Sequence, residues 1–340
     1  MILDNNAPLP VGKLPADLLA RLLAQSPASD PRVLLGPGIG LDCAVLDFDS
    51  TLLVLKSDPI TFATDEIGWY AVQVNANDIA TSGADPRWMM VTLLLPEGQT
   101  TVEYVEGISR QLQAACRAIG VSIIGGHTEI TYGLDRPIIL GVMIGEVSRE
   151  RLVTPRGAAP GDHILLTKGV PIEATALLAR EFPERLEGIL QPDEINQARE
   201  FLYQPGISVL ADARYACRAG RVTAMHDPTE GGLLAALWEM AEACGHAMAV
   251  DFSLVTIPPL ARRVCEVFGI DPLAAIASGA LLLTAVAEDA AEICLALESE
   301  GIPCTIIGRV EAGSASVISV AGEQRQTALR PTRDEIAKVF

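Results

Sequence analysis

Apolar positions recur at two spacings along the chain, and their distribution predicts an α+β protein. Spacings of three and four residues predict amphipathic helices, whereas short apolar runs between turn residues predict strands. After an extended start, we expect helices at 14–25, around 75–78 and at 102–119, and strands at 43–48, 51–56, 60–64, 87–95, 121–124 (buried) and 137–147. This order predicts helices on one face of a mixed sheet.

The Pro- and Gly-rich segment at 155–162 (PRGAAPGD) is the best candidate for a linker. A chain of 340 residues is long enough for two cores, so we expect an N-terminal domain at 1–154 and a C-terminal α+β sandwich domain at 155–340. In the second domain we expect strands at 163–168, 222–225, 280–286, 303–310 and 315–320, and helices at 172–182, 193–203, 207–219, 233–244, 258–267 and 288–299.

The stretch VQVNANDIATSGADP (72–86) carries an unusual polar row. At helical spacing, Ala71, Asn75, Asp78 and Ser82 share one face of a segment that is otherwise too apolar for a solvated helix. Polar groups in apolar surroundings need partners, and a carboxylate there needs a cation or a strong donor. Two interpretations stay open: local caps where the helix ends, or a polar site.

Composition and charge exclude several classes of protein. Hydrophobic residues make up 49% of the chain and aromatic residues 4%, which is typical of a compact α/β-type protein. The formal net charge of −18 argues against a surface for nucleic acid or for an anionic membrane. The longest apolar runs are too short to span a bilayer and no secretion signal is visible, so we expect a cytoplasmic protein. The seven cysteines form no CxxC pair and are expected to be reduced core thiols.

Four acidic residues occur in one kind of setting, at or just beyond an expected strand end or in the polar helix, beside Gly, Pro or Asn. They are Asp42, Asp58, Asp78 and Asp227. Aspartate is a common turn residue, and each position alone fits that role. Clustered carboxylate and amide oxygens are also the ligands that hard divalent cations prefer, and Mg²⁺ is held by a few carboxylates together with substrate phosphates. Four acids in the same context favour a metal site.

The Gly-rich stretch IIGGHTE (123–129) follows the expected buried strand. Gly125 and Gly126 allow close backbone approach and Thr128 offers a hydroxyl, which would suit an anion. The stretch is neither a P-loop nor a dinucleotide-binding motif, and tight turns use paired glycines routinely. His127 has two open interpretations: a hydrogen-bonded structural imidazole, or a contact to phosphate or substrate.

The stretch HDPTEGGL (226–233) is the sharper motif. Thr229 can cap the following helix, and Gly231 and Gly232 open its first turn to close approach. Helix N-termini of this kind bind phosphate. An ordinary capped helix start, with Glu230 in the first turn, explains the same residues.

Two lysines each end an expected strand, and both have two interpretations. Lys56 and Lys168 could neutralise phosphate, although solvated lysines at strand ends are common. No GxSxG motif or other activated nucleophile is present, and Cys and His lack the spacing of a metal site.

Together these segments resemble the AIR synthase (PurM)-like superfamily, which includes aminoimidazole ribonucleotide synthetase, the hydrogenase maturation protein HypE, thiamine-monophosphate kinase and selenophosphate synthetase. The resemblance is strongest to HypE, through DPTxGGL and the SG…IG ending. It runs from about 36 to 310, and it rests on the GDDAAV-like element at 40–45, Ser57-Asp58, the NxxD-type helix at 75–78 followed by SGADP, GGHTE at 125–129, DPTEGGL at 227–233 and SGALLL…IIGRV at 278–310.

The resemblance implies a two-domain PurM-like fold in which N-terminal domains from two copies form a shared barrel. It also implies an ATP cleft near the dimer interface, with phosphates bound through Mg²⁺. Carried over by position, Asp42, Asp58 and Asp78 would be metal ligands and Asp227 would reach in from the second domain. The residues implied to contact ATP or its phosphates are Lys56, Asn75, Asn77, Gly125, Gly126, His127, Thr128, Thr229, Gly231 and Gly232.

Several positions depart from the family pattern. Leu41 stands where a second acid is frequent, His127 replaces the acid of the kinase-type GG[DE]T, and Glu230 replaces the Arg of DPTRGG. HypE acts through a C-terminal cysteine, whereas this sequence ends in Val339-Phe340. Selenophosphate synthetase needs a reactive residue near its N-terminus, and no Cys precedes position 43. We therefore expect the fold and the ATP cleft, but neither specialised chemistry.

The first functional hypothesis is an ATP- and Mg²⁺-dependent enzyme that phosphorylates or ATP-activates an oxygen of a small molecule. The alternative is a HypE-like assembly factor that binds nucleotide and a protein partner without turnover, and a third possibility is a nucleotide sensor. The apolar strands of the first domain predict a homodimer, and the negative charge predicts neither nucleic-acid nor membrane partners.

Overall fold

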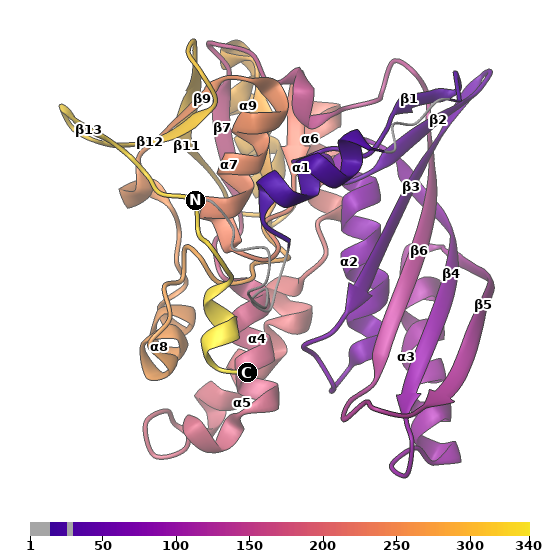
Figure 1. Ribbon diagram of the computed structural model, residues 1–340. Coiled ribbons are helices and arrows are strands. Elements are labelled where there is room, and N and C mark those ends of the chain that lie inside the picture. Colours follow the sequence, from indigo (N-terminus) through magenta and orange to yellow (C-terminus); the bar gives the residue numbers. More distant parts are fainter. Residues whose placement is uncertain (1–13, 26–29) are drawn as a thin grey trace.

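The computed structural model describes residues 14–25 and 30–340, which form two units, each built on one mixed sheet (Figure 1). The first sheet has the strand order β1-β2-β3-β6-β4-β5, in which only the β4–β5 pair is parallel. Its strands are β1 (Val33–Leu35), β2 (Ala44–Phe48), β3 (Thr51–Ile60), β4 (Asp85–Pro96), β5 (Ser122–Thr131) and β6 (Ile138–Val147).

Helices lie on one face of this sheet, as the element order predicts. They are α2 (Ile67–Thr81) and α3 (Val102–Ile119), while α1 (Ala16–Ala24) precedes the first strand (Figure 1). Along β6, Ile139 and Met143 are buried on the helix side, whereas Leu140 on the other side is exposed. In Figure 1 no helix from the described part of the chain covers this outer face.

The second sheet has the order β13-β12-β9-β11-β7-β10-β8, with only the β12–β9 pair parallel. Its strands are β7 (His163–Thr167), β8 (Val222–His226), β9 (Ala247–Val250), β10 (Leu282–Ala285), β11 (Cys304–Glu311), β12 (Ser316–Ala321) and β13 (Gln324–Thr327). The helices of this unit are α4 (Ile172–Glu181), α5 (Pro192–Glu200), α6 (Leu210–Ala219), α7 (Gly232–Cys244), α8 (Pro259–Phe268) and α9 (Ala287–Ser299).

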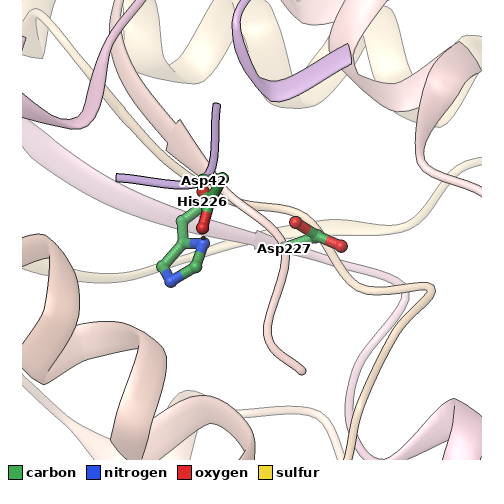
Figure 2. A group of neighbouring side chains, drawn as sticks. All are labelled: Asp42, His226 and Asp227. Carbon is green, nitrogen blue, oxygen red and sulfur yellow. Dashed lines mark ion pairs between the residues drawn. The ribbon is translucent and has the colours of Figure 1, made fainter. Parts of the chain in front are cut away.

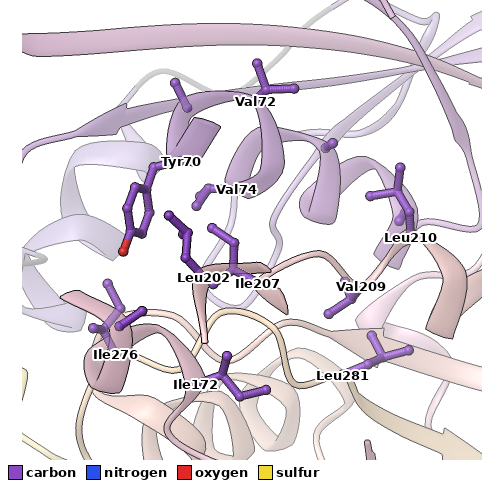
Figure 3. Packing of buried hydrophobic residues seen from close by; sticks show 14 of the residues in the cluster. Tyr70, Val72, Val74, Ile172, Leu202, Ile207, Val209, Leu210, Ile276 and Leu281 are labelled. Carbon is purple, nitrogen blue, oxygen red and sulfur yellow. The ribbon is translucent and has the colours of Figure 1, made fainter. Parts of the chain in front are cut away.

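Helix α2 is the centre of the molecule, because it packs against the first sheet on one side and against the second unit on the other. Every residue of α2 except Trp69 is buried. Figure 3 shows Tyr70 and Val74 facing Leu202 and Ile207 of the second unit. A helix enclosed on all sides needs apolar residues all round, which explains why this segment lacks an amphipathic pattern.

The two-domain α+β fold is confirmed, and the helix expected at 102–119 has those bounds. Two strand predictions are wrong. The third strand ends at Ile60, so 60–64 is not a separate strand, and β5 is an exposed edge strand where a buried one was expected at 121–124. Strand β5 pairs only with β4, so neither its far edge nor its side chains are covered within the described chain.

The short strands β1, β9 and β13 were not predicted, because three or four residues are too few to show a recognisable alternation of apolar and polar positions. The domain boundary expected between 154 and 155 stays a prediction, and it falls in the connection between β6 and β7. The extended start expected before residue 14 lies outside the described residues. Within the described ranges, no helix is long and apolar enough to cross a membrane.

Candidate functional site

Three side chains from two distant parts of the sequence meet where the two units join (Figure 2). Asp42 lies in the loop before β2, His226 ends β8, and Asp227 follows it. One ligand atom from each of the three lies within 4.8 Å of the others. Gly40 sets the loop close to α7: its φ is +67°, and a Cβ there would lie 2.2 Å from the carbonyl oxygen of Glu239.

His226 is held between two carboxylates and is almost fully buried. Its Nδ1 lies 2.9 Å from Asp42 Oδ2, and its Nε2 lies 2.9 Å from Glu239 Oε2. Burial alone would lower the pKa of His226, but the two carboxylates outweigh it and raise that pKa well above its usual value. Burial alone would raise the pKa of Asp42, but His226 and, to a lesser extent, Lys56 outweigh it and lower that pKa. His226 therefore orients Asp42, with both ring nitrogens already engaged.

Asp227 is the carboxylate that most clearly lacks a counter-charge. It is 1% exposed, and neither carboxylate oxygen accepts a hydrogen bond from any described residue. Burial, followed by repulsion from Asp42, raises the pKa of Asp227 to about 7. A buried carboxylate with unused lone pairs beside a second carboxylate is a suitable ligand set for a hard divalent cation such as Mg²⁺.

Lys56 contacts Asp58 and Asp78, the other two predicted metal ligands. Its Nζ lies 3.3 Å from Asp78 Oδ2 and 3.6 Å from Asp58 Oδ2. Burial raises the pKa of Asp78 well above its usual value, and Asp227, Asp42 and Asp58 add to this while Lys56 opposes it. The four predicted acids thus form one group around Lys56, which we call the carboxylate cluster (Asp42, Asp58, Asp78 and Asp227).

The two asparagines of α2 hold backbone in place. Asn75 Oδ1 accepts a hydrogen bond from the Asp58 backbone N–H at 3.0 Å, and its Nδ2 donates to the carbonyls of Asp58 and, within the helix, Ala71. Asn77 Nδ2 donates to the Ile207 carbonyl at 2.7 Å, and its Oδ1 accepts from the Val209 N–H at 2.9 Å. Asn75 positions a cluster residue, whereas Asn77 joins the two units.

The residues at 125–128 lie elsewhere. They are part of β5 and, with α3, line a hollow of about 450 Å³ that no member of the carboxylate cluster lines. The His127 side chain is 66% exposed and its Nε2 lies 3.3 Å from Glu129 Oε2. Within one copy of the chain, the Gly-rich stretch is therefore a strand and not a loop above the carboxylate cluster.

The start of α7 differs from the expected open anion site. The Gly231 N–H donates to Asp334 Oδ2 at 2.5 Å, so a carboxylate of this chain already occupies the position expected for phosphate. A Cβ at Gly232 would lie within 2.7 Å of the carbonyl oxygens of Leu273 and Ala275, which explains that glycine by packing. Thr229 lines a small interdomain pocket together with Asp58. Lys168 is not available to phosphate, because it pairs with the buried Asp212 at 3.1 Å.

Family models match both units of the chain. The N-terminal domain of AIR synthase related protein matches residues 40–147, and the C-terminal domain matches residues 159–321. The chain belongs to the AIR synthase-related family. A putative hydrogenase expression/formation protein of Methanocaldococcus jannaschii is 30% identical over 318 residues, which cover 89% of this chain and 90% of that protein. Carbamoyl dehydratase HypE of Escherichia coli is 27% identical, covering 74% of this chain and 73% of that protein.

Solved structures share the fold of this AIR synthase-related chain. HypE in complex with ATP has a TM-score of 0.71 at 22% identity, covering 94% of this chain and 96% of that one. ThiL complexed with AMPPCP and TMP has a TM-score of 0.69 at 21% identity, covering 92% and 95%. A HypE–HypF complex contains a chain with a TM-score of 0.71 at 21% identity, covering 92% and 99%.

The sequence did not predict four residues of the candidate site in this AIR synthase-related chain. His226 is adjacent to Asp227 in HDPTEGG, and that adjacency was the available signal. Glu239 and Asp334 gave no local signal, because they reach the site only through α7 and the C-terminal segment. Glu173 lies in the pocket that Asp58 and Thr229 line, and burial raises its pKa to about 8.

Proposed function

We propose that the protein binds ATP and Mg²⁺ at the carboxylate cluster and uses the nucleotide to phosphorylate or activate an oxygen of a small molecule. The observation that carries this proposal is Asp227, a buried carboxylate with two unused oxygens facing a second carboxylate. Family membership supports it, because solved relatives of the same fold are complexes with ATP and with AMPPCP.

Each residue of the carboxylate cluster has a defined task in this proposal. Asp42 and Asp227 hold one Mg²⁺ between the units, with His226 fixing Asp42, and Asp58 and Asp78 extend the ligand set around Lys56. Bound Mg²⁺ supplies positive charge that cancels the charge of the phosphates. The protein's own contribution is positioning and electrostatics, and Asn75 secures the Asp58 backbone for that purpose.

A homodimer is part of the proposal, and the outer face of the first sheet supports it. Apolar side chains alternate onto this uncovered face at Leu55, Met90, Leu140, Val142 and Ile144. Monomeric proteins rarely leave such a continuous apolar sheet face in water. A second copy packed against it would form the shared barrel.

The exposed edge strand β5 is expected to contribute to the dimer as well. It carries Gly125, Gly126, His127 and Thr128 on the periphery of the first sheet. We propose that these residues reach the nucleotide bound by the partner copy, which explains their distance from the carboxylate cluster within one chain. Thr229 and Lys56 would contact the phosphates from the same copy.

An assembly factor that binds nucleotide without turnover is the second candidate function. The relatives are named as hydrogenase expression/formation proteins and as carbamoyl dehydratase HypE, and one relative is solved in a HypE–HypF complex. In this second function, the chain binds nucleotide and a protein partner, and it does not turn over a small-molecule substrate. A cytoplasmic location stays a prediction under both candidates.

Thermal-shift titration with ATP, ADP and a non-hydrolysable analogue, with and without Mg²⁺, tests the proposal. A specific site raises the melting temperature by several degrees at saturating ligand. We expect a Mg²⁺-dependent shift in the wild type and in Asp135→Asn, an exposed control, but not in Asp78→Asn or Asp227→Asn. No shift with any nucleotide would overturn the proposal. Measuring ADP release with candidate substrates then separates an enzyme from a binding protein.

A further inference from the structure

A second cavity, of about 550 Å³, lies where the two units meet on another side of α2. Its walls are the end of α2 with the turn after it (80–85), the connection at 150–153, helix α6 and the segment at 220–222. No residue of the carboxylate cluster lines this cavity. Its size and interdomain position are those of small-molecule sites.

Arginine dominates the polar lining of this cavity. The lining includes four guanidinium groups but only two carboxylates, in a chain whose net charge is −18. The four arginines are Arg151, Arg214, Arg218 and Arg221, and all four are exposed enough to meet a ligand from solvent. A basic lining within a strongly acidic protein is a local reversal of charge that favours an anion.

Asp85 organises two of these arginines from opposite walls. Arg214 Nη2 on α6 lies 3.0 Å from Asp85 Oδ1, and Arg151 Nη1 lies 3.5 Å from Asp85 Oδ2. Arg151 Nη2 also donates to the Gly83 carbonyl at 3.2 Å. One carboxylate thus orients two guanidinium groups and neutralises only one of them. Preoriented guanidinium groups bind phosphoryl oxygens through paired N–H donors.

Arg218 adds charge on the same side of α6. It lies four residues after Arg214, so the two cations are neighbours on the helix surface and repel each other in the absence of an anion. Arg221 is different, because Asp289 accepts hydrogen bonds from its Nε and Nη2. Glu150, the second carboxylate of the lining, offsets one further unit of charge. The remaining positive charge of the cavity therefore lies around Arg151, Arg214 and Arg218.

We propose that this cavity is a second ligand site, separate from the carboxylate cluster, that binds a small phosphorylated compound through Arg151, Arg214 and Arg218. The site needs neither ATP nor a metal ion, because its cations are supplied by the chain. Occupancy bridges the two units, since the end of α2 forms one wall and α6 forms the other. The ligand is thus expected to stabilise the junction on which the carboxylate cluster is built.

Calorimetric titration with inorganic pyrophosphate in EDTA tests the site, because the carboxylate cluster repels pyrophosphate without a metal. We expect binding by the wild type, an affinity about tenfold or more lower in Arg214→Gln/Arg218→Gln, and unchanged affinity in Asp78→Asn. Arg117→Gln is the matched control, since Arg117 is also exposed in the last turn of a helix. Arg218→Gln alone serves as the test if the double variant does not fold.

Alkylation of Cys217, which lines the cavity, locates the ligand directly. Pyrophosphate should slow the reaction of Cys217 with N-ethylmaleimide, measured by mass spectrometry, and should leave the partly buried Cys244 unchanged. Absence of binding by the wild type overturns the proposal. Equal binding by the arginine variant, loss of binding in Asp78→Asn, or unprotected Cys217 overturns it as well.

Discussion

His226 Nδ1 lies 2.9 Å from Asp42 Oδ2, and this ion pair joins the end of β8 to the loop before β2. Glu239 of α7 holds the other ring nitrogen, so three segments of the chain are tied through one imidazole. The side chain of His226 is 1% exposed. Ion pairs in such surroundings are costly to break, because the remaining partner stays buried without its counter-charge.

Replacing His226 should therefore destabilise the protein strongly. We expect His226→Gln to lower the free energy of unfolding by about 3 kcal/mol, because Asp42 and Glu239 would lose their shared cation. Urea denaturation measures the change. His127→Gln is the control, and we expect it to stay within about 0.5 kcal/mol of wild type because His127 is exposed. Equal midpoints for the two variants would contradict this assignment.

Asp227→Asn should stabilise the metal-free protein and abolish Mg²⁺-dependent nucleotide binding. The pKa of Asp227 in the folded protein is raised to about 7, so the folded state is favoured when Asp227 is protonated. This contribution to stability is fully present below the pKa of the unfolded state and is lost as pH rises through 7. The melting temperature of Asp227→Asn without metal should exceed that of wild type by a few degrees at pH 8 and match it near pH 4. A pH-independent difference would argue against an unpaired carboxylate.

Glu173 provides a pH test in the neighbouring pocket. Burial raises its pKa to about 8, and Glu230 adds to this, so the folded protein is most favoured when Glu173 is protonated. Its contribution is fully present below the unfolded pKa and is lost as pH rises through 8. We expect Glu173→Gln to melt about 2 °C or more above wild type at pH 9 and to match it at low pH. Exposed Glu187→Gln should show no such trend.

The proposed dimer can be tested on the outer face of the first sheet. Leu140→Asp places a charge in the middle of the apolar face and should convert the dimer to a monomer in sedimentation velocity experiments. Leu295→Asp is the control, because Leu295 is 66% exposed on α9, far along the chain in the second unit. A wild-type monomer at micromolar concentration, or a Leu140→Asp dimer, would count against the shared barrel.

Strong local patterns were sufficient for most of the fold. The helix at 102–119 follows from its apolar spacing, and Asp42, Asp58, Asp78 and Asp227 could be selected from their similar settings. The nature of α2 was less accessible, because its polar row fits both a helix end and a site. In the structure Asn75 lies in the middle of α2, so the helix-end interpretation does not apply to it. Its side chain bonds to Ala71 within the helix and to the Asp58 backbone, and the polar-site interpretation stays a prediction.

Residue types and spacing thus specified most of the secondary structure, the family motifs and the set of candidate acids, since these depend on neighbours a few positions apart. Tertiary structure decided which groups meet. His226 lies between Asp42 and Glu239, and Asp334 lies at the start of α7. The Gly-rich stretch is part of the edge strand β5. The electrostatic state of a carboxylate depends on burial and on charges brought from distant segments, and the local sequence carries neither.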